Sequence, residues 1–333
     1  MNRAAVLCGL GAWVPPTVVT NDDLATRLDV SDEWIRSRTG IGQRRLIDPG
    51  SATSDLAVEA GERAMKSAGT TTCDMVLLAT TTPDHPVPGT APAVAARLGQ
   101  TGVAAVDVNA ACSGFVYGLA TAAAFITASI ADRVLLIGAD AFSTVVDPAD
   151  RTTAPLFGDG AGAVMLRAGT PDEPGALRAF DLGSEGDRAD LIMQKSGGSR
   201  QRSTLLEPAD ADRWVTMNGQ AVFRSAIECM TESSRTVLRK AGQSIADVSW
   251  VAAHQANSRI LSAVAKKLEF PAERMLMNVD RVGNTSAASI PLVLEDAVRA
   301  GTLTAGQLVL ITAFGAGLTW GSTLVRWPDL TVD

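Results

Sequence analysis

The sequence contains an internal duplication, which strongly limits the folds it can adopt. Two halves of the 333-residue chain run in parallel at an offset of about 173 residues. The matched segments are LAVEAGERAMKSAG with CMTESSRTVLRKAG, DMVLLAT with DVSWVAA, VDVNAACSG with MNVDRVGNTS, and DRVLLIGAD with GQLVLITAF. The duplication predicts two similar halves, 1–172 and 173–333, that pack around a pseudo-twofold axis and place Cys112 and Asn284 at corresponding positions.

Within each half, short apolar runs alternate with segments long enough for helices. Apolar runs without polar alternation are typical of strands in parallel sheets that are covered on both faces. The sequence therefore predicts an α/β fold with mainly parallel sheets. Strand-to-helix loops at corresponding places in the two halves would converge at the carboxyl ends of strands, where such proteins bind ligands.

Composition and charge exclude several classes of protein. The chain is 46% hydrophobic and 20% charged, which is typical of a globular protein. With 29 basic and 36 acidic residues its net charge is −7, so we expect no general binding to nucleic acid or to an anionic membrane. The run Val116–Ile130 is too short to span a bilayer, and Ala4–Leu10 is expected to be a buried strand rather than a signal peptide. We therefore expect a cytoplasmic protein.

Cysteine and histidine are scarce, and this limits the chemistry of the chain. The four cysteines are Cys8, Cys73, Cys112 and Cys229. They are far apart and form no C-x-x-C pair, so we expect no disulfide framework, no structural zinc site and no bound metal. Of the 2 histidines, His85 lies among prolines and is expected to be structural, which leaves imidazole chemistry to His254.

Cys112 lies in NAACSG, between the strand-like run VAAVDV (103–108) and a long apolar segment. Ser113 and Gly114 suit the start of a helix. A free thiol has a pKa of about 8.5, and a helix N-terminus favours the thiolate, so Cys112 is a candidate nucleophile. The alternative is a small buried side chain, which is the interpretation we favour for the other three cysteines.

His254 and Asn284 are the polar side chains expected to lie beside Cys112. His254 ends the apolar run VSWVAA, and Asn284 lies in RVGNTSA, after another predicted strand. An imidazole at the end of a buried strand should stay neutral, and an amide does not titrate. Two neutral donors aimed at one oxygen could stabilise a thioester enolate by about 3 kcal/mol each. With an acyl group on Cys112, this indicates carbanion chemistry at a thioester.

A glycine-lined loop, ITAFGAGLTWGS, follows the last long apolar run. Its backbone N–H groups near Ala316, together with the N–H of Cys112, could form a second oxyanion hole for the acylated cysteine. The glycines would also suit a tight turn, and the two interpretations are compatible.

Six motifs give the chain a resemblance to β-ketoacyl-acyl carrier protein synthase III, a family of thiolase-fold condensing enzymes. They are DEWIRSRTGI, NAACSGF, FGDGAGA, AAHQANSRI, VGNTSAASIPL and FGAGLTWGS, in the family's order, and the resemblance covers nearly the whole chain. It implies a thiolase-like fold, layered αβαβα, and a homodimer. It also implies an initiating enzyme, because elongating ketosynthases have a second histidine where this chain has Asn284.

The resemblance also assigns a function to each candidate residue. The family's acyl-accepting cysteine corresponds to Cys112, and its histidine and asparagine correspond to His254 and Asn284. The implied reaction begins when an acyl-CoA acylates Cys112 and CoA leaves. Malonyl-acyl carrier protein is then decarboxylated, and the carbanion attacks the Cys112 thioester to give 3-oxoacyl-acyl carrier protein. No cofactor is implied, because acyl-CoA is a substrate.

Two binding surfaces follow from the same resemblance. The CoA channel corresponds to Trp34, Arg38, Thr39, Arg151 and Asn257. An aromatic face and guanidinium groups suit an adenine and phosphates, whereas arginines outside the channel are expected to be surface charges: Arg36, Arg44 and Arg45. A cationic patch for an acidic carrier protein corresponds to Arg224, Arg259, Lys266 and Lys267.

The acyl pocket corresponds to Val87 and Phe314. Some members of the family place a phenylalanine at the first position, where it reaches across the dimer and closes the pocket. The smaller Val87 predicts room for propionyl, butyryl or branched primers as well as acetyl. This departure also fits priming ketosynthases of aromatic polyketide pathways, so fatty acid and polyketide synthesis both stay open.

Other classes of protein fit the sequence less well. A papain-like protease also uses Cys, His and Asn in this order, but Cys112 lacks its local signature and lies in a duplicated α/β pattern. A nucleotide-dependent oxidoreductase would need a glycine where VLCGLGAWV has Val14. A non-catalytic acyl-CoA-binding protein would be expected to lose the nucleophile. The enzymatic alternative left open is an acyltransferase that passes the Cys112 acyl group to a hydroxyl or amine without decarboxylation.

Overall fold

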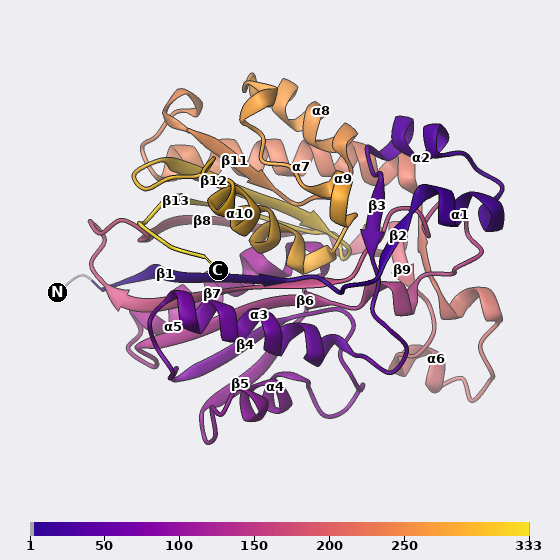
Figure 1. Cartoon of the computed structure of the whole chain (residues 1–333), viewed down its shortest axis with the longest axis horizontal. Coiled ribbons are helices and arrows are strands. Elements are labelled where there is room, and N and C mark those ends of the chain that lie inside the picture. The colour runs from indigo at the N-terminus through magenta and orange to yellow at the C-terminus, as the bar shows by residue number, and fades with distance from the viewer. Residues whose placement is uncertain (1–2, 333) are drawn as a thin grey trace.

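Two β-sheets, stacked with helices between and outside them, organise the chain in the computed structural model, which describes residues 3–332 (Figure 1). The first sheet has the order β1-β7-β6-β4-β5 and the second the order β11-β12-β13-β8. The strands of the first are β1 (Ala4–Trp13), β4 (Met75–Ala79), β5 (Ala104–Val108), β6 (Arg133–Asp140) and β7 (Gly160–Gly169). Those of the second are β8 (Leu177–Ser184), β11 (Trp250–Ala253), β12 (Leu308–Gly315) and β13 (Thr319–Arg326).

The two sheets repeat one topology, as the duplication predicts. Written in reverse, the second sheet has the order β8-β13-β12-β11, which corresponds strand by strand to β1-β7-β6-β4 of the first sheet. Only β5 has no counterpart in the second sheet. The sheets are mixed rather than mainly parallel as we expected, because in each of them one strand, β7 or β13, runs antiparallel to both of its neighbours. The remaining neighbours pair in parallel. The boundary that we placed at 172/173 falls between β7 and β8, and the division into 1–172 and 173–333 stays a prediction.

Helices form the other three layers, so the observed arrangement is the predicted αβαβα. The outer helices are α3 (Thr53–Ser67) and α4 (Ala91–Arg97) on the first sheet, and α7 (Gly219–Lys240) and α8 (Ser258–Leu268) on the second. The central layer consists of α5 (Gly114–Thr127) and α10 (Ser289–Arg299), which contact both sheets. Helix α5 is apolar on nearly every side, and this suits a helix enclosed between two sheets.

Shorter elements surround this frame. They are α1 (Asn21–Leu28), α2 (Asp32–Thr39), α6 (Ser199–Arg202) and α9 (Val279–Val282), and two short antiparallel strand pairs, β2 (Val18–Thr20) with β3 (Gln43–Arg45) and β9 (Ile192–Gln194) with β10 (Val215–Met217). No helix within residues 3–332 is long and apolar enough to cross a membrane.

The second half departs from the prediction where its fifth strand should be. We expected a strand before Asn284, in the position that β5 has before Cys112. The chain there makes only one parallel bridge, Val251 with Met275, and then forms the short helix α9. Leu276 and Asn278 bond to Val251 and Gln255 instead of continuing a ladder, so the second sheet has four strands.

Candidate active site

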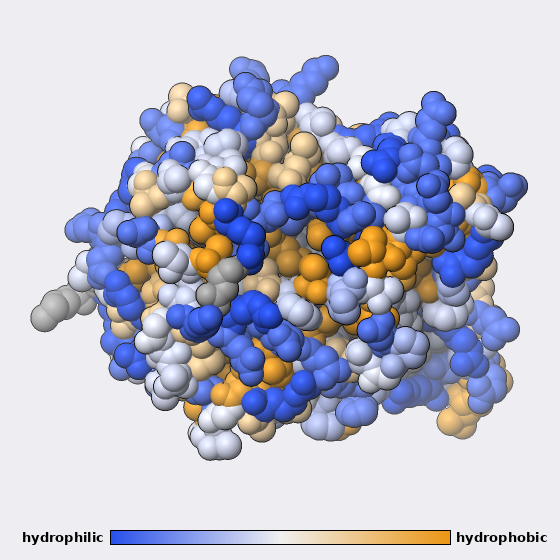
Figure 2. Space-filling view, viewed as in Figure 1, coloured by the Kyte–Doolittle hydropathy of each residue, from blue (hydrophilic) through white to orange (hydrophobic). Residues whose placement is uncertain are grey.

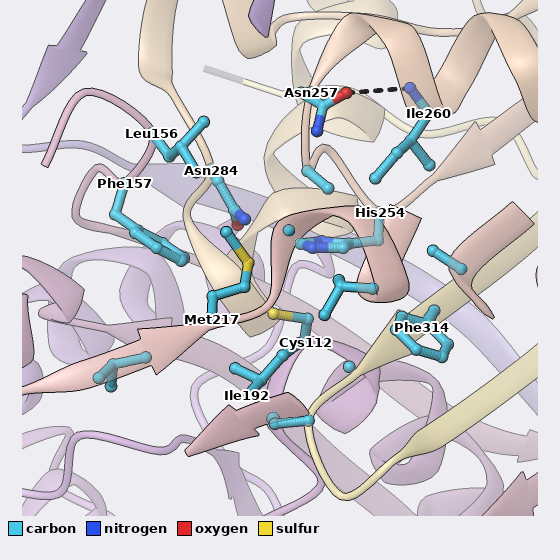
Figure 3. A pocket seen from close by; sticks show the side chains of 18 of the residues that line it. Cys112, Leu156, Phe157, Ile192, Met217, His254, Asn257, Ile260, Asn284 and Phe314 are labelled. Atoms are coloured by element: carbon cyan, nitrogen blue, oxygen red, sulfur yellow. Dashed lines mark hydrogen bonds between the residues drawn. The ribbon is translucent and has the colours of Figure 1, made fainter. Parts of the chain in front are cut away.

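A cavity of about 960 Å³ contains most of the candidate residues. Those that line it are Cys112, His254, Asn284, Phe314, Ala316, Trp34, Arg38, Thr39, Arg151, Asn257 and Arg259. The side chains of Cys112, His254 and Asn284 converge in the same part of it (Figure 3). The remaining candidates, Val87, Arg224, Lys266 and Lys267, do not line this cavity.

Cys112 lies in a tight turn between β5 and α5. The Asn109 Oδ1 atom accepts a hydrogen bond from the backbone N–H of Ala111 at 3.3 Å. Ala111 has a positive φ of 46°, and residues 111–113 form a 3₁₀ turn that leads directly into α5. Cys112 therefore lies at the N-terminus of a buried helix, as the sequence predicts.

Asn284 begins a second turn of the same construction. Its Oδ1 atom accepts a hydrogen bond from the N–H of Ser286 at 2.9 Å, Ser286 has a positive φ of 51°, and residues 286–288 form a 3₁₀ turn before α10. The hydrogen bonds thus match Asn284 with Asn109. Our pairing of Asn284 with Cys112 was wrong by three residues, because the residue equivalent to Cys112 is Ala287.

The two turns contact each other and the opposite sheets. The Cys112 Sγ atom lies 3.6 Å from the Ser286 Oγ atom. A Cβ atom added at Gly315, at the end of β12, would lie 2.7 Å from the Cys112 backbone nitrogen. A Cβ at Gly138, in β6, would lie 2.6 Å from the Ala287 carbonyl oxygen. Each sheet thus uses a glycine to let the turn of the other half approach.

A strand-like segment fixes the backbone of Asn284. The N–H of Asn284 donates to the Leu156 carbonyl oxygen at 2.8 Å, and its own carbonyl accepts from the N–H of Gly158 at 3.0 Å. The adjoining Pro155 carbonyl accepts a hydrogen bond from Arg44 at 2.9 Å. Arg44 is only 1% exposed, so the prediction that it is a surface charge was wrong. Its donors also bind the Asn21 Oδ1 atom and the Val19 carbonyl, which allows the guanidinium to be buried.

His254 follows β11, and it is buried. Its Nδ1 atom lies 2.7 Å from the Ser289 Oγ atom, at the first residue of α10. Burial lowers the pKa of the imidazole to about 3. The expectation of a neutral His254 is therefore confirmed, and the ring can act as a neutral donor or acceptor at ordinary pH.

The thiol of Cys112 has an environment that differs from our expectation. Burial raises its pKa to about 12, and the carboxyl group of Asp140 acts in the same direction, whereas the Ser286 hydroxyl opposes it. The N-terminus of α5 is present, but the loss of water around the sulfur is the larger effect on the charged form. The raised pKa favours the thiol form of Cys112 over the thiolate at neutral pH.

Asp140 is a buried carboxyl group that we did not identify from the sequence. It ends β6, is fully buried, and accepts hydrogen bonds from the Thr81 N–H and hydroxyl at 2.8 Å and from the Ala287 N–H at 3.1 Å. It therefore ties the loop after β4 to the turn that follows Asn284. A single acidic residue at the end of the apolar run RVLLIGAD was the available indication.

The residues assigned to the CoA channel all line the cavity. Trp34 and Arg38 are on α2, with the Arg38 guanidinium carbon 4.3 Å from the centre of the Trp34 ring. Thr39 uses its hydroxyl within the chain, donating to the Ile35 carbonyl at 2.7 Å. The Asn257 Oδ1 atom accepts from the Ile260 N–H at 2.9 Å and caps α8, so its amide NH₂ group is left for a ligand (Figure 3).

Comparisons with known proteins agree with this architecture. Residues 106–186 match the family model described as 3-oxoacyl-[acyl-carrier-protein] synthase III, and residues 238–327 match the model of its C-terminal part. A β-ketoacyl-[acyl-carrier-protein] synthase III from Streptomyces coelicolor is 56% identical over 99% of both chains.

Solved structures give the same result. The crystal structure of 3-oxoacyl-(acyl carrier protein) synthase III from Pseudomonas aeruginosa superposes with a TM-score of 0.92 at 49% identity, over 98% of this chain and 99% of that one. The priming β-ketosynthase of the R1128 polyketide pathway superposes with a TM-score of 0.92 at 31% identity, over 99% and 98% of the two chains.

The duplicated five-layered fold is that of the thiolase-like condensing enzymes, which are acyltransferases. Within that class, the chain belongs to the 3-oxoacyl-[acyl-carrier-protein] synthase III family. It is an initiating ketosynthase that condenses an acyl-CoA with malonyl-acyl carrier protein.

Proposed function

We propose that Cys112 carries the acyl primer and that His254 and Asn284 stabilise the enolate formed from malonyl-acyl carrier protein. The observation that supports this is the convergence of a half-buried thiol, a buried neutral imidazole and a buried amide in one cavity. Attack of the Cys112 sulfur on the acyl-CoA carbonyl breaks the bond to the CoA sulfur, and the thiol proton of Cys112 leaves with CoA, which departs as its free thiol. The backbone N–H groups of Cys112 and Ala316 are proposed to bind the oxyanion of this step.

The second half-reaction begins once CoA has left. Loss of CO₂ from the malonyl group leaves an electron pair that forms an enolate, and its oxygen accepts hydrogen bonds from His254 and Asn284. The enolate carbon then attacks the Cys112 thioester, and the cysteine sulfur leaves. A neutral His254 suits this step, because a donor that does not titrate near pH 7 keeps its proton while the enolate forms. The proposed reaction uses the two thioester substrates and no further cofactor.

Two measurements test this function. Intact-mass analysis after competition among acetyl-, propionyl-, butyryl- and branched acyl-CoA would show whether Cys112 is acylated, and by which primer. Release of labelled CO₂ from malonyl-acyl carrier protein would test the condensing half. If Cys112 becomes acylated but no primer supports CO₂ release, the condensing reaction is contradicted, and transfer of the acyl group to a hydroxyl or amine is the alternative to test next.

We also propose a homodimer formed through β5. This strand is at the edge of the first sheet, and its Val106 side chain is 46% exposed. An exposed apolar edge strand is a surface that proteins usually cover. Val87, in the loop after β4, is 85% exposed and lies outside the cavity of its own chain, which fits a residue that closes the acyl pocket of a partner.

The size of the primer depends on this dimer. If Val87 contributes to the partner's pocket, Val87→Phe would reduce acylation by butyryl- and branched acyl-CoA and leave acetyl-CoA nearly unaffected. Val106→Asp should give a monomer in analytical ultracentrifugation, and in that monomer the Val87→Phe change should have no effect on primer choice. Equal primer selectivity in Val87→Phe and wild type would contradict the pocket assignment.

The carrier protein is proposed to dock on a cationic face beside the cavity. Arg224 is on α7, and Arg259, Lys266 and Lys267 are on α8, which packs against it. All four are exposed, and hydrophilic side chains project over α8 at the top of the view in Figure 2. Arg259 also lines the cavity, so this face leads to the active site. Arg259→Glu should raise the KM for malonyl-acyl carrier protein but not for acyl-CoA.

The pathway that receives the product is proposed to be fatty acid or polyketide synthesis. Both are consistent with the relatives, since one similar structure is a priming ketosynthase of a polyketide pathway and others are 3-oxoacyl-(acyl carrier protein) synthases. Comparing KM values for carrier proteins of the two kinds, each loaded with malonyl, would assign the pathway.

A further inference from the structure

Ser289 is the only hydrogen-bond partner of the His254 ring within residues 3–332, yet it does not line the cavity. Its Oγ atom lies 2.7 Å from the His254 Nδ1 atom and is 3.3 Å from the backbone nitrogen of Gln255. Ser289 itself is 1% exposed. Its single proton and its lone pairs must therefore be satisfied by these two neighbours.

The backbone of Gln255 is fixed by the side chain of the same residue. The amide Nε2 donates to the carbonyls of Ala253 at 2.8 Å and Leu276 at 3.1 Å, and Oε1 accepts from the N–H of Asn278 at 3.2 Å. Because a backbone N–H can only donate, the Ser289 oxygen must accept the hydrogen bond from Gln255. The remaining question is what the Ser289 proton does.

The neutral His254 ring has two tautomers, and they differ in free energy because they satisfy the Ser289 hydroxyl differently. If Nδ1 carried the proton, the Ser289 oxygen would accept two hydrogen bonds and its own proton would be buried without an acceptor. A buried polar group left without a partner costs about 1–3 kcal/mol. If Nδ1 is bare, it accepts the Ser289 proton and every group is satisfied. The second arrangement puts the imidazole proton on Nε2.

The Nε2 atom makes no hydrogen bond within the described part of the chain, and His254 lines the cavity. We propose that Ser289 is a positioning residue that holds neutral His254 in the Nε2–H tautomer, so that the ring offers a donor to the enolate oxygen. The opposite tautomer would offer a lone pair there, and a lone pair repels an oxyanion. This inference rests on the proposed function of His254.

The same turn orients both donors of the site. The N–H of Ser286 can only donate, so the Asn284 atom that accepts from it must be Oδ1, which leaves the Asn284 NH₂ group for the cavity. Three residues later, Ser289 sets the ring of His254. The start of α10 therefore selects the donor face of an amide and of an imidazole together.

The tautomer can be observed directly, because the chain has 2 histidines. In the full-length protein labelled with ¹⁵N-histidine, a long-range ¹H–¹⁵N correlation spectrum would distinguish protonated from bare ring nitrogens. His254→Asn assigns the signals by removing one set. We expect a bare Nδ1 and a protonated Nε2 for His254 in the wild type. A protonated Nδ1 would overturn the proposal.

Ser289→Ala tests the link to catalysis. We expect it to disturb the His254 tautomer and to lower CO₂ release at least about tenfold, because a misdirected donor in a dry site loses most of its effect. Acylation of Cys112 should stay within about threefold of wild type, since His254 is not proposed to act in that step. Ser289→Thr, which keeps the hydroxyl, should restore the wild-type spectrum and most of the CO₂ release.

Ser286→Ala is the matched control, because it removes a neighbouring hydroxyl that contacts Cys112 and not His254. It should leave the His254 spectrum unchanged. Equal loss of acylation and CO₂ release in Ser289→Ala would indicate a merely structural residue and overturn the proposal, as would full CO₂ release. If Ser289→Ala does not fold, the wild-type and Ser289→Thr spectra still decide the tautomer. Failure of the proposed function is distinguishable, because wild type would then release no CO₂ whatever its tautomer.

Discussion

The turn from Asn109 to Gly114 and the turn from Asn284 to Ser289 are two copies of one structure with different contents. In each, an asparagine Oδ1 atom accepts from the N–H two residues later, the residue that carries this N–H has a positive φ, and a 3₁₀ turn leads into a central helix. The first copy carries a thiol at its fourth position, where the second has Ala287.

The difference shows how a duplicated frame can make an asymmetric site. The first copy supplies the Cys112 thiol, the proposed nucleophile, and the Cys112 backbone N–H. The second supplies the Asn284 amide and two hydroxyls, one beside the Cys112 sulfur and one beside the His254 ring. The frame brings the two helix starts together, and the proposed roles of their side chains divide the two half-reactions between them.

The largest expected effect comes from removing the nucleophile of the first copy. Cys112→Ala should abolish acylation by acyl-CoA, because no other thiol lines the cavity among the described residues. Intact-mass measurement after incubation with acyl-CoA checks this. The variant should still fold, since Ala287 occupies the equivalent position in the second turn. An acyl adduct on the Cys112→Ala protein would show that a different residue carries the primer.

Paired asparagine substitutions compare the two turns directly. Asn284→Ala should lower CO₂ release about 10²–10³-fold, the usual cost of losing one donor to an oxyanion, and leave acylation nearly intact. Asn109→Ala removes the same kind of turn hydrogen bond but no proposed donor, so CO₂ release should fall only a few-fold. Both half-reactions are measured in each variant. Similar losses in the two variants would mean that the turn geometry, not the amide, matters.

The sequence predicted the frame of this molecule better than its details. The duplicated apolar runs predicted two similar α/β halves with covered sheets, since a buried strand needs little more than a continuous apolar stretch. The layered αβαβα order came from the family resemblance. The apolar runs also led to Cys112, His254 and Asn284. The sequence alignment of the two halves was wrong at the site. Asn109 and Asn284 each make the hydrogen bond that defines their own turn, so Asn284 corresponds to Asn109 and not to Cys112.

Burial is what the sequence could not show. Arg44 looks like any surface cation until the loop at Pro155 covers it. The pKa of Cys112 could not be predicted from its place at a helix start, because the opposing effect comes from residues distant in the chain that exclude water. Ser289 is likewise one serine in NTSAAS until α10 brings it to His254.

A glycine pair tests how closely each turn must approach the opposite sheet. Gly315→Ala and Gly138→Ala should each destabilise the protein by about 1–3 kcal/mol, because the added methyl group meets backbone atoms of a turn. Only Gly315→Ala presses on the backbone nitrogen of Cys112, so it alone should slow acylation, by about tenfold. Urea unfolding and single-turnover acylation separate the two effects. Equal acylation rates in the two variants would contradict this distinction.

The pH dependence of Cys112 alkylation shows which of two opposing effects on the pKa of its thiol is larger. The N-terminus of α5 lowers this pKa, and burial raises it. A thiol with a pKa of about 12 stays protonated at neutral pH, and its thiolate fraction rises tenfold per pH unit. The rate of Cys112 alkylation by iodoacetamide should therefore rise without a plateau from pH 7 to pH 10. In the urea-unfolded chain, the same cysteine should approach a plateau above about pH 8.5. A plateau near neutral pH in the folded protein would show that the helix N-terminus dominates.

The smallest effect is expected at Ser286, where the two turns touch. Its hydroxyl lies 3.6 Å from the Cys112 sulfur and lowers the pKa of the thiol, so Ser286→Ala should slow acylation about three- to fivefold, as a hydrogen bond of about 1 kcal/mol would. The backbone should tolerate alanine at this positive φ, because Ala111 already occupies the equivalent position in the first turn. Single-turnover acylation at several pH values is the measurement. If Ser286→Ala instead lowers CO₂ release by the same factor at every pH and leaves acylation unchanged, the Ser286 hydroxyl acts on the enolate, like Asn284, and not on the thiol.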